Sequence, residues 1–554
     1  MRGARPAPRH SLQVPGRENG ALRARAAGAA PHAAARRTTE GRRSRGLHSG
    51  VAGAAAARRP SSPSPSSSSH RPAHPELDAA VVGGGIAGLL AAYRLLQRHP
   101  SWRVTVLESA RHVGGRTRTS VFAGTTVSTG AGVGRSGKDV RLASLLEELG
   151  LPIQSRGATA EADARQVRRL ALLRAAQPRD GATFRSFARG VLGDAELRAF
   201  VTTMGHTDML EASAGETMLH YGLEDNVHSW TPFSVPWNAL CETLRKRVQA
   251  FPGGHVLTGA RVARIRWPRS WADCACGDKD SEGQGFRHAA AAAAGDRYAL
   301  FAKHTSAPPT ADTRATRAHP GTATAAAAFP STDLARLTLA GGTVHLARRV
   351  IVAVPIDSMV PLLPRWFVPR VSRIRGQPFI RVYARVARVH VPLVAAAVGK
   401  FRVVSPSPLM KMGAVDAASG TFMVAFADGP AAVHLAKHLE VVGPPRSTAP
   451  GACSPKQYLE ALVTEALDLS GAIAALRPSG RAHRRSRDGV VRLTSFAAFW
   501  FPVGTHYYEP RTGTRAEKGT CSTRLFVVGE AVSHNQGWTE GALETVDAVM
   551  PLVH

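Results

Sequence analysis

Short apolar runs alternate with helical periodicity along much of this chain. Residues 79–82 form a continuous apolar run, which is typical of a buried parallel strand. Residues 86–98 (IAGLLAAYRLLQR) place apolar side chains around most of a helix, and residues 104–107 form a second apolar run that ends at Glu108. A strand, a helix and a strand in this order form one βαβ unit, so the pattern predicts an α/β fold built on a parallel sheet.

The same patterns predict further elements along the chain. The expected helices are residues 138–150, with Gly150 as the C-cap, residues 455–468, and a last helix that opens at Gly537. A hairpin is expected over residues 334–346. The other expected strands are residues 260–265, 297–303, 349–355 (stopped by Pro355), 379–391 (with one polar face) and 524–530.

Two regions have compositions that do not predict a packed core. Residues 1–75 are rich in Arg, Ala and Ser, with 14 arginines and only two acids, and residues 61–69 read as a Ser/Pro linker. This composition favours an organelle transit peptide, for a plastid or a mitochondrion, over a disordered extension that is retained. Residues 268–333 contain alanine runs between polar and proline-rich pieces and are interpreted as a low-complexity insertion.

Charge and cysteine content exclude some classes of protein. The formal net charge is +31, but it comes almost wholly from arginines spread along the chain, and residues 1–75 have no interleaved aromatic side chains to stack bases. We therefore expect no nucleic-acid partner. No apolar run is long enough to predict a transmembrane segment. Five cysteines in 554 residues do not form a disulfide framework, and the pair Cys274 and Cys276 lacks a second ligand pair at metal-binding spacing.

The turn between the first strand and the first helix carries a dinucleotide-binding pattern. Gly83, Gly85 and Gly88 stand in G-x-G-x-x-G spacing. The first glycine allows a tight turn, the second lets the backbone approach a pyrophosphate, and the third lets the helix pack closely on the strand. Glu108 lies at the end of the next strand, where a carboxylate can accept hydrogen bonds from a ribose hydroxyl. A glycine turn without a ligand is the alternative.

Two more segments fit a phosphate-bearing cofactor. Gly114-Gly-Arg-Thr117 follows the acid-bearing strand, so Gly115 permits close backbone approach and Arg116 can neutralise a phosphate. Near the C-terminus a strand runs into Gly529 and Glu530, and a glycine-rich helix start follows. A helix N-terminus can stabilise negative charge on a reduced isoalloxazine ring. Glu530 could also be a simple helix cap.

With these motifs the chain resembles the FAD-dependent amine oxidase superfamily, which includes monoamine and polyamine oxidases, L-amino-acid oxidases, protoporphyrinogen oxidase and carotenoid desaturases. The resemblance rests on VVGGGIAGL, the acid, GGRTRT, VIVAVP and LFVVGEAVSHNQGWTEGALETVDAV, and it extends over about residues 76–554. It implies FAD as the cofactor and a Rossmann-like FAD-binding domain with a second, α+β substrate domain. The motifs are specific for the flavoproteins and weak for the substrate.

The resemblance also implies roles by position. Gly83, Gly85 and Gly88 would hold the pyrophosphate, and Glu108 the adenosine ribose. Val262 would present its backbone to adenine. Gly115 and Arg116 would lie along the pyrophosphate and flavin side. At the other end of the chain, Gly529 and Glu530 would bind the ribitol–phosphate region, and Trp538, Gly541 and Ala542 would lie beside the flavin ring.

The substrate side departs from the family pattern. The expected acid-Leu-Gly-Gly piece reads Val127-Ser-Thr-Gly-Ala-Gly132 here, and the segment after Pro355 offers no lysine of the kind that is water-bridged to flavin N5 in many members. Aromatic residues shortly before the last flavin strand would line the substrate face, although core packing is the alternative for each. The candidates are Trp500, His506, Tyr507 and Tyr508, and Trp500, Tyr508 and Trp538 are the predicted catalytic residues.

These observations predict an FAD-dependent oxidoreductase that oxidises an amine or amino-acid C–N bond by hydride transfer to flavin N5, with O2 as the electron acceptor and H2O2 as the product. The alternatives are a desaturase or porphyrinogen oxidase of the same fold, acting on a pigment precursor, and a flavin-binding protein with little turnover. The substrate would be a small molecule. The expected FAD-binding domain comprises residues 76–155, 240–355 and 490–554, and the expected substrate domain residues 156–239 and 356–489.

Overall fold

The computed structural model describes residues 76–155, 164–223, 231–273, 333–398, 403–404, 407–442, 453–469, 490–510 and 524–554. Several predictions fall outside these described residues. They are the transit peptide and linker at 1–75, the strand at 297–303, the cysteine pair at 274 and 276, and nearly all of the insertion at 268–333.

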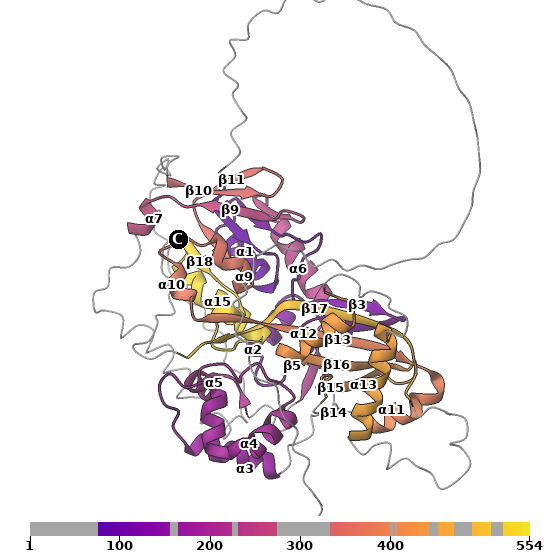
Figure 1. Cartoon of the computed structure of the whole chain (residues 1–554). Helices are drawn as coiled ribbons and strands as arrows, with labels where there is room; N and C mark the ends of the chain where they lie inside the picture. Colours follow the sequence, from indigo (N-terminus) through magenta and orange to yellow (C-terminus); the bar gives the residue numbers. More distant parts are fainter. Residues whose placement is uncertain are drawn as a thin grey trace, which may run out of the picture. The chain divides into compact units, whose positions relative to one another are not determined.

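A five-stranded sheet of order β18-β12-β1-β2-β8 carries the glycine motif, and all of its neighbouring strands are parallel. Its edge strand β18 is labelled in Figure 1. Its strands are β1 (Ala79–Val82), β2 (Val104–Leu107), β8 (Gly254–Leu257), β12 (Val350–Val352) and β18 (Leu525–Val527). The predicted α/β class with a parallel sheet is therefore confirmed.

Alternating side chains of this sheet enter two different cores. Ala79 and Val81 of β1 pack with four helices on one face, whereas Ala80 and Val82 pack with a small antiparallel sheet and short helices on the other. The helices are α1 (Ile86–Arg98), α2 (Val140–Glu148), α6 (Trp237–Gln249) and α15 (Thr539–Val549). The other face is covered by β9 (Val262–Arg266), β10 (Ala335–Leu339), β11 (Val344–Ala347), α9 (Ile356–Met359), η3 (Val360–Leu362) and α10 (Val368–Val371).

A second five-stranded sheet is antiparallel and has the order β14-β15-β16-β13-β17. Its strands are β13 (Ile374–Val386), β14 (Val403–Val404), β15 (Lys411–Asp416), β16 (Thr421–Asp428) and β17 (Leu493–Tyr508). One face packs against α11 (Val391–Val398), α12 (Gly429–His438) and α13 (Pro455–Leu469). The hairpin of β3 (Thr119–Phe122) and β4 (Thr125–Ser128) contributes Phe122 and Val127 to the other face, where they meet Tyr383.

The long strands β13 and β17 contribute residues to one core of the parallel sheet and to the core of the antiparallel sheet. Trp500 of β17 packs against the core between the antiparallel sheet and its helices, whereas Tyr508 at the end of the same strand belongs to the core under the parallel sheet. The strand predicted over 379–391 with one polar face is present, but its bounds differ. It runs over Ile374–Val386, and the chain then turns into η4 (Arg388–His390) and α11. On its polar face Arg381 is buried and Arg385 is exposed.

A further core is made mainly by helices. It joins α3 (Ala164–Ala175), α4 (Phe184–Met204, interrupted at Gly193) and α5 (Ala214–His220), which lie together in Figure 1. The small sheet of β5 (Gly134–Arg135), β7 (Pro232–Ser234) and β6 (Gln154–Ser155) and the helices α7 (Ser270–Asp273), η6 (Glu530–Val532) and η7 (Met550–Leu552) complete the described elements.

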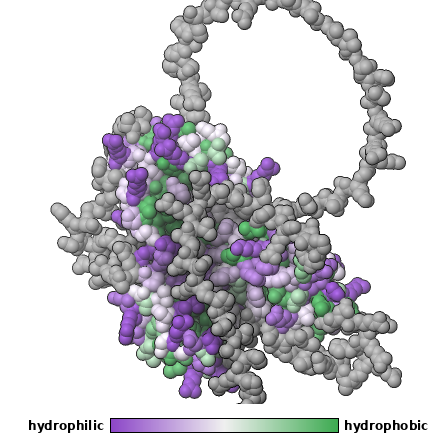
Figure 2. Space-filling model, viewed as in Figure 1, coloured by the Kyte–Doolittle hydropathy of each residue, from purple (hydrophilic) through white to green (hydrophobic). Residues whose placement is uncertain are grey.

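The predicted hairpin, the helices at 138–150 and 455–468 and the last helix are confirmed. Gly150 has a φ of +67°, as a glycine after a helix C-terminus often does. Within the described residues no helix has the length and apolar character needed to cross a bilayer. On the face drawn in Figure 2, hydrophilic and hydrophobic residues are interspersed over the described surface. The predicted division into two domains stays a prediction.

Candidate active site

The first glycine turn leaves no room for side chains at two positions and open space at the third. Gly83 has a φ of +109°. A Cβ atom on Gly88 would lie 2.0 Å from the carbonyl oxygen of Gly83, so α1 packs directly on the turn. A Cβ on Gly85 would meet nothing within 4 Å. Gly85 is also the N-cap of α1 and makes no side-chain cap, so the turn presents backbone N–H groups next to open space.

The acid at the end of β2 lies against the same turn. Gly84 N–H donates to Glu108 Oε2 at 2.7 Å, and Ala110 N–H donates to Oε1 at 2.7 Å. The Glu108 carbonyl accepts from Ala260 N–H at 2.7 Å, which brings the chain leading to Val262 beside it. The residues predicted to hold the adenosine end of a dinucleotide are therefore gathered around Glu108.

The two glycine turns are hydrogen-bonded to each other. Gly114 N–H donates to the Gly84 carbonyl at 2.8 Å, and Gly85 and Gly114 form an isolated parallel bridge. Gly114 and Gly115 have φ values of +110° and +52°, conformations that an L-side chain rarely adopts. Spacing along the sequence could not place these turns side by side, because that contact depends on how the chain returns after β2.

Arg116 and Glu530 form an ion pair within this group. Arg116 also donates to the Gly504 carbonyl at 3.0 Å. The buried Glu530 carboxylate lies 2.5 Å from His506 Nδ1 and accepts from Gly537 N–H at 2.9 Å. Burial alone would raise the pKa of Glu530, but its contacts with His506 and Arg116 outweigh burial and hold the pKa well below the usual range.

His506 connects Glu530 to the segment after Pro355. Its Nε2 accepts from the Ile356 N–H at 3.1 Å, while Nδ1 faces Glu530. An imidazole with its proton on Nδ1 satisfies both contacts. The sequence singled out His506 only as a wall candidate, so its contact with Glu530 is a finding of the structure.

The C-terminal segment is tightly built around its glycines. Gly529 has a φ of +120°, and its N–H donates to Thr545 Oγ1 at 2.8 Å. A Cβ on Gly541 would lie 2.3 Å from the Asn535 carbonyl oxygen, and Ala542 is buried. Trp538 precedes α15 and stacks under the Arg135 guanidinium, 3.5 Å from the ring centroid. These residues lie along the chain on both sides of the Glu530 network.

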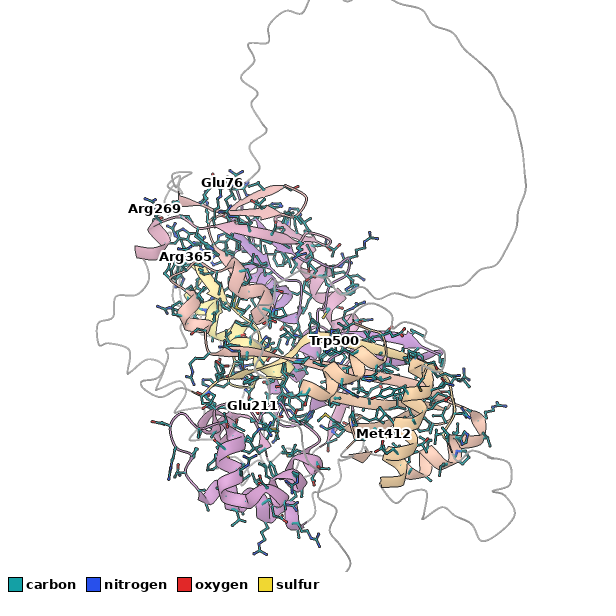
Figure 3. All side chains as sticks on the ribbon, in the orientation of Figure 1. Glu76, Glu211, Arg269, Arg365, Met412 and Trp500 are labelled. Carbon is teal, nitrogen blue, oxygen red and sulfur yellow. The ribbon has the colours of Figure 1, made fainter. Side chains whose placement is uncertain are left out.

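The four residues predicted to line the substrate face do not all lie together in the structure. His506, Tyr507 and Tyr508 line one small cavity of about 30 Å³, together with Asp208, Glu216, Tyr221 and Gln536 among others. Trp500 does not lie there. It packs on the helix-covered face of the antiparallel sheet, on β17 (Figure 3). The structure therefore brings Tyr508 but not Trp500 to the pocket beside Glu530.

A buried charged cluster adjoins this pocket and was missed by sequence reasoning. Asp208 accepts a hydrogen bond from the Tyr221 hydroxyl, and burial together with the negative charge of Asp428 raises the pKa of Asp208 to about 7. Asp428 accepts from Thr207 N–H at 3.0 Å and lies 3.3 Å from His206 Nδ1. Lys411, fully buried, lies 5.2 Å from the Phe426 ring centroid. These residues are far apart in the sequence and belong to no motif, so no sequence signal indicates that they lie together.

The segment that lacks the family acid is held by backbone contacts. Ala131 N–H donates to the Arg116 carbonyl at 2.9 Å, and a Cβ on Gly130 would lie 1.9 Å from that same oxygen. The Tyr383 hydroxyl donates to the Ser128 carbonyl at 2.6 Å, which ties β13 to the end of β4. A tyrosine of the antiparallel sheet thus anchors the segment where the acid is absent.

The fold has counterparts among known proteins. Residues 81–149 match the model of an NAD(P)-binding Rossmann-like domain. No curated protein sequence matches the chain significantly. Solved structures of putrescine oxidase are similar over most of the chain: a single mutant has a TM-score of 0.55 at 15% identity, and the wild type bound to putrescine has 0.53 at 15%. Each comparison covers 86% of this chain and 98% of that chain.

This similarity confirms the predicted resemblance to the FAD-dependent amine oxidases at the level of the fold, a Rossmann-like unit with a second, mixed unit. The roles of single residues are not settled by fold. Those predicted for Gly83, Gly85, Gly88, Glu108, Gly115, Arg116, Val262, Gly529, Glu530, Trp538, Gly541 and Ala542 remain predictions that agree with their positions.

Proposed function

We propose that this protein is an FAD-dependent oxidoreductase that oxidises a C–H bond next to nitrogen in a small amine or amino acid. The observation that carries the proposal is a continuous chain of contacts. Hydrogen bonds join Glu108 to Gly84 and Gly84 to Gly114, the chain leads from Gly114 to Arg116, and an ion pair joins Arg116 to Glu530. These are the residues expected at the adenosine, pyrophosphate and flavin ends of one extended cofactor. The fold, which is that of amine oxidases, supports the same reading.

The glycine turns fit the phosphates of such a cofactor. The open space at Gly85, next to the unsatisfied N–H groups at the start of α1, suits a pyrophosphate, because N–H groups and the helix dipole both favour an anion. Glu108 Oε1 accepts from Ala110 N–H and from the Ser109 hydroxyl, whereas Oε2 accepts from Gly84 N–H and keeps a lone pair that can accept from a ribose hydroxyl. A mononucleotide would not need the contacts that extend to Glu530.

FAD, when bound, would supply the two-electron acceptor, and the protein would supply position and a polarised surround. The buried Glu530 carboxylate contacts Arg116, His506 and the Gly537 N–H and so holds all three in one arrangement. Tyr508 and His506 line a cavity of about 30 Å³, which has room for a group the size of a substrate nitrogen and presents an aromatic wall to it. No general base is assigned, since a neutral amine can deliver hydride without one.

A peroxide assay on the purified full-length protein tests the substrate part of the proposal. Amines, amino acids and porphyrinogens would be offered as separate classes under air, with flavin bleaching under nitrogen as a second readout. We expect bleaching and peroxide release with members of the first two classes. Turnover confined to a porphyrinogen or to an isoprenoid pigment precursor would reject the amine assignment and support the desaturase or porphyrinogen oxidase alternative.

A further inference from the structure

Three potential metal ligands converge at the rim of the pocket, outside the contacts assigned to the cofactor. Glu216 and His220 stand one turn apart on α5 and therefore share a face of that helix. His534 follows η6 in the segment after Glu530. Glu216 Oε2 lies 4.0 Å from His220 Nε2 and 4.0 Å from His534 Nδ1. Their ligand atoms all lie within 4.8 Å of one another.

We propose that Glu216, His220 and His534 form a site for a divalent transition metal, with Zn²⁺ as the best match. Two imidazole nitrogens and one carboxylate are a ligand set that Zn²⁺ prefers, whereas Ca²⁺ and Mg²⁺ prefer oxygen ligands alone. Bond lengths of about 2.0–2.1 Å would place tetrahedral ligands about 3.3 Å apart. The present distances are somewhat longer, and half-exposed side chains can close them by small rotations.

The surroundings allow an ion to reach this position. The exposed fractions of the Glu216, His220 and His534 side chains are 30%, 33% and 44%. The ring centroids of His220 and His534 lie 4.3 Å apart, and the ring planes are tilted by 45°. This arrangement does not turn the nitrogens of both rings away from a shared metal position. All three residues line the cavity that also contains Tyr508 and Gln536. A metal with three protein ligands would have its remaining coordination position toward that cavity, open to water.

The position of the site gives it a structural consequence. Glu216 and His220 lie on α5, a helix that packs with α3 and α4, whereas His534 lies between Glu530 and Gly537, which are joined by a hydrogen bond. A bound ion would fasten α5 to the segment expected beside the cofactor. Occupancy would therefore restrict motion of this pocket wall. None of the three residues is among those expected to bind the cofactor. The proposed metal site can therefore be tested independently of the proposed function.

Zinc titration of the chelator-treated full-length protein, without an affinity tag, tests the site by calorimetry. We expect one saturable Zn²⁺ site, and at least tenfold weaker binding in both His220→Ala and His534→Ala. Glu216→Gln keeps the size of the side chain but removes the charge, and it should weaken binding by a similar factor. His255→Ala, an exposed histidine on β8, is the matched control and should bind as the wild type does.

Cobalt substitution gives a readout that does not depend on stability or on flavin. Co²⁺ bound by two histidines and a carboxylate should give visible ligand-field absorption, which the His220→Ala/His534→Ala double variant should lose. Thermal unfolding of each variant without metal shows that it is folded, and Glu216→Gln provides a second test if a histidine variant is not. Absence of saturable zinc binding to the wild type, or equal zinc binding by wild type and double variant, would overturn the proposal.

Discussion

Arg116 and Glu530 form an ion pair across 414 residues of sequence. Arg116 belongs to the second glycine turn, and Glu530 follows the last strand of the parallel sheet. Glu530 is buried and Arg116 is about a quarter exposed, with side-chain exposed fractions of 8% and 27%. Removing one partner of a buried pair leaves the other uncompensated, so this contact makes the two ends of the expected cofactor site depend on each other.

Glu530→Gln should lower both stability and flavin content. The variant keeps the shape of the side chain but leaves Arg116 without its anionic partner, and we expect a loss of about 1–3 kcal/mol in the free energy of unfolding. Urea denaturation and the flavin-to-protein ratio measure the two effects. Glu148→Gln is the control, because the ion pair between Glu148 and Arg94 is partly exposed to solvent. The loss in its free energy of unfolding should stay below about 1 kcal/mol. Equal losses in the two variants would contradict this account.

The same residue predicts an acid limb in the stability profile. Because the pKa of Glu530 is lower in the folded state than its ordinary value of 4.5, its contribution is fully present above that pH. It is lost progressively as the pH falls below about 4.5, where the unfolded state binds the extra proton. The stability gap between wild type and Glu530→Gln should therefore narrow in acid. A gap of constant size between pH 7 and pH 3 would show that the Glu530 charge does not carry the effect.

Gly85 and Gly88 should respond to substitution in opposite ways. Gly85→Asn places a good N-cap side chain in open space, so the fold should keep its stability while the side chain occupies the expected pyrophosphate position and abolishes FAD binding. Gly88→Ala would put a Cβ against the Gly83 carbonyl and should cost about 1–3 kcal/mol. Thermal unfolding and flavin content measure both.

Gly190→Ala is the control for these glycine variants, since its Cβ on α4 would meet nothing within 4 Å. It should leave the flavin content unchanged. Retention of stoichiometric FAD by a folded Gly85→Asn variant would remove the pyrophosphate role from this turn.

Local patterns explain how much of this structure could be predicted. The strand at 79–82, the helix at 86–98 and the acid at 108 follow from periodicity and from steric rules for glycine, both of which act over a few residues. The ion pair at Arg116, the cluster around Asp208 and the position of Trp500 do not. They depend on the tertiary contacts of residues hundreds of positions apart. The strand predicted over 379–391 differs from β13 in its bounds, because the alternating pattern continues past Val386, where the chain turns into η4 and α11.

Asp208 should make the protein less stable as the pH rises toward neutrality. Burial and the nearby Asp428 raise the pKa of Asp208 to about 7, so the folded state holds a proton that the unfolded state has released above about pH 4. Stability contributed by this group is therefore lost between about pH 4 and pH 7. Asp208→Asn should remove about 2–4 kcal/mol of that pH dependence. Urea unfolding at pH 5 and pH 8 measures it, and identical pH profiles for wild type and variant would refute the assignment.

Substitutions of Trp500 and Tyr508 should have different effects on the kinetic constants. Trp500 packs in the core between β17 and the helices, so Trp500→Phe should lower stability with little change in KM. Tyr508 lines the pocket beside His506, so Tyr508→Phe should change KM or kcat severalfold. Steady-state peroxide release with the best amine substrate gives both constants. A larger kinetic effect at Trp500 than at Tyr508 would place the substrate on the other side of the antiparallel sheet.

The identity of the bound cofactor decides whether the glycine turns and Glu530 form an FAD site. The full-length protein, purified without added flavin and then denatured, would be analysed for the released chromophore by chromatography against FAD, FMN and NAD standards. We expect a yellow protein that releases about one FAD per chain and whose colour is bleached by an amine under nitrogen. A colourless protein that cannot be reconstituted with FAD, or one that releases only a nicotinamide nucleotide, would contradict it.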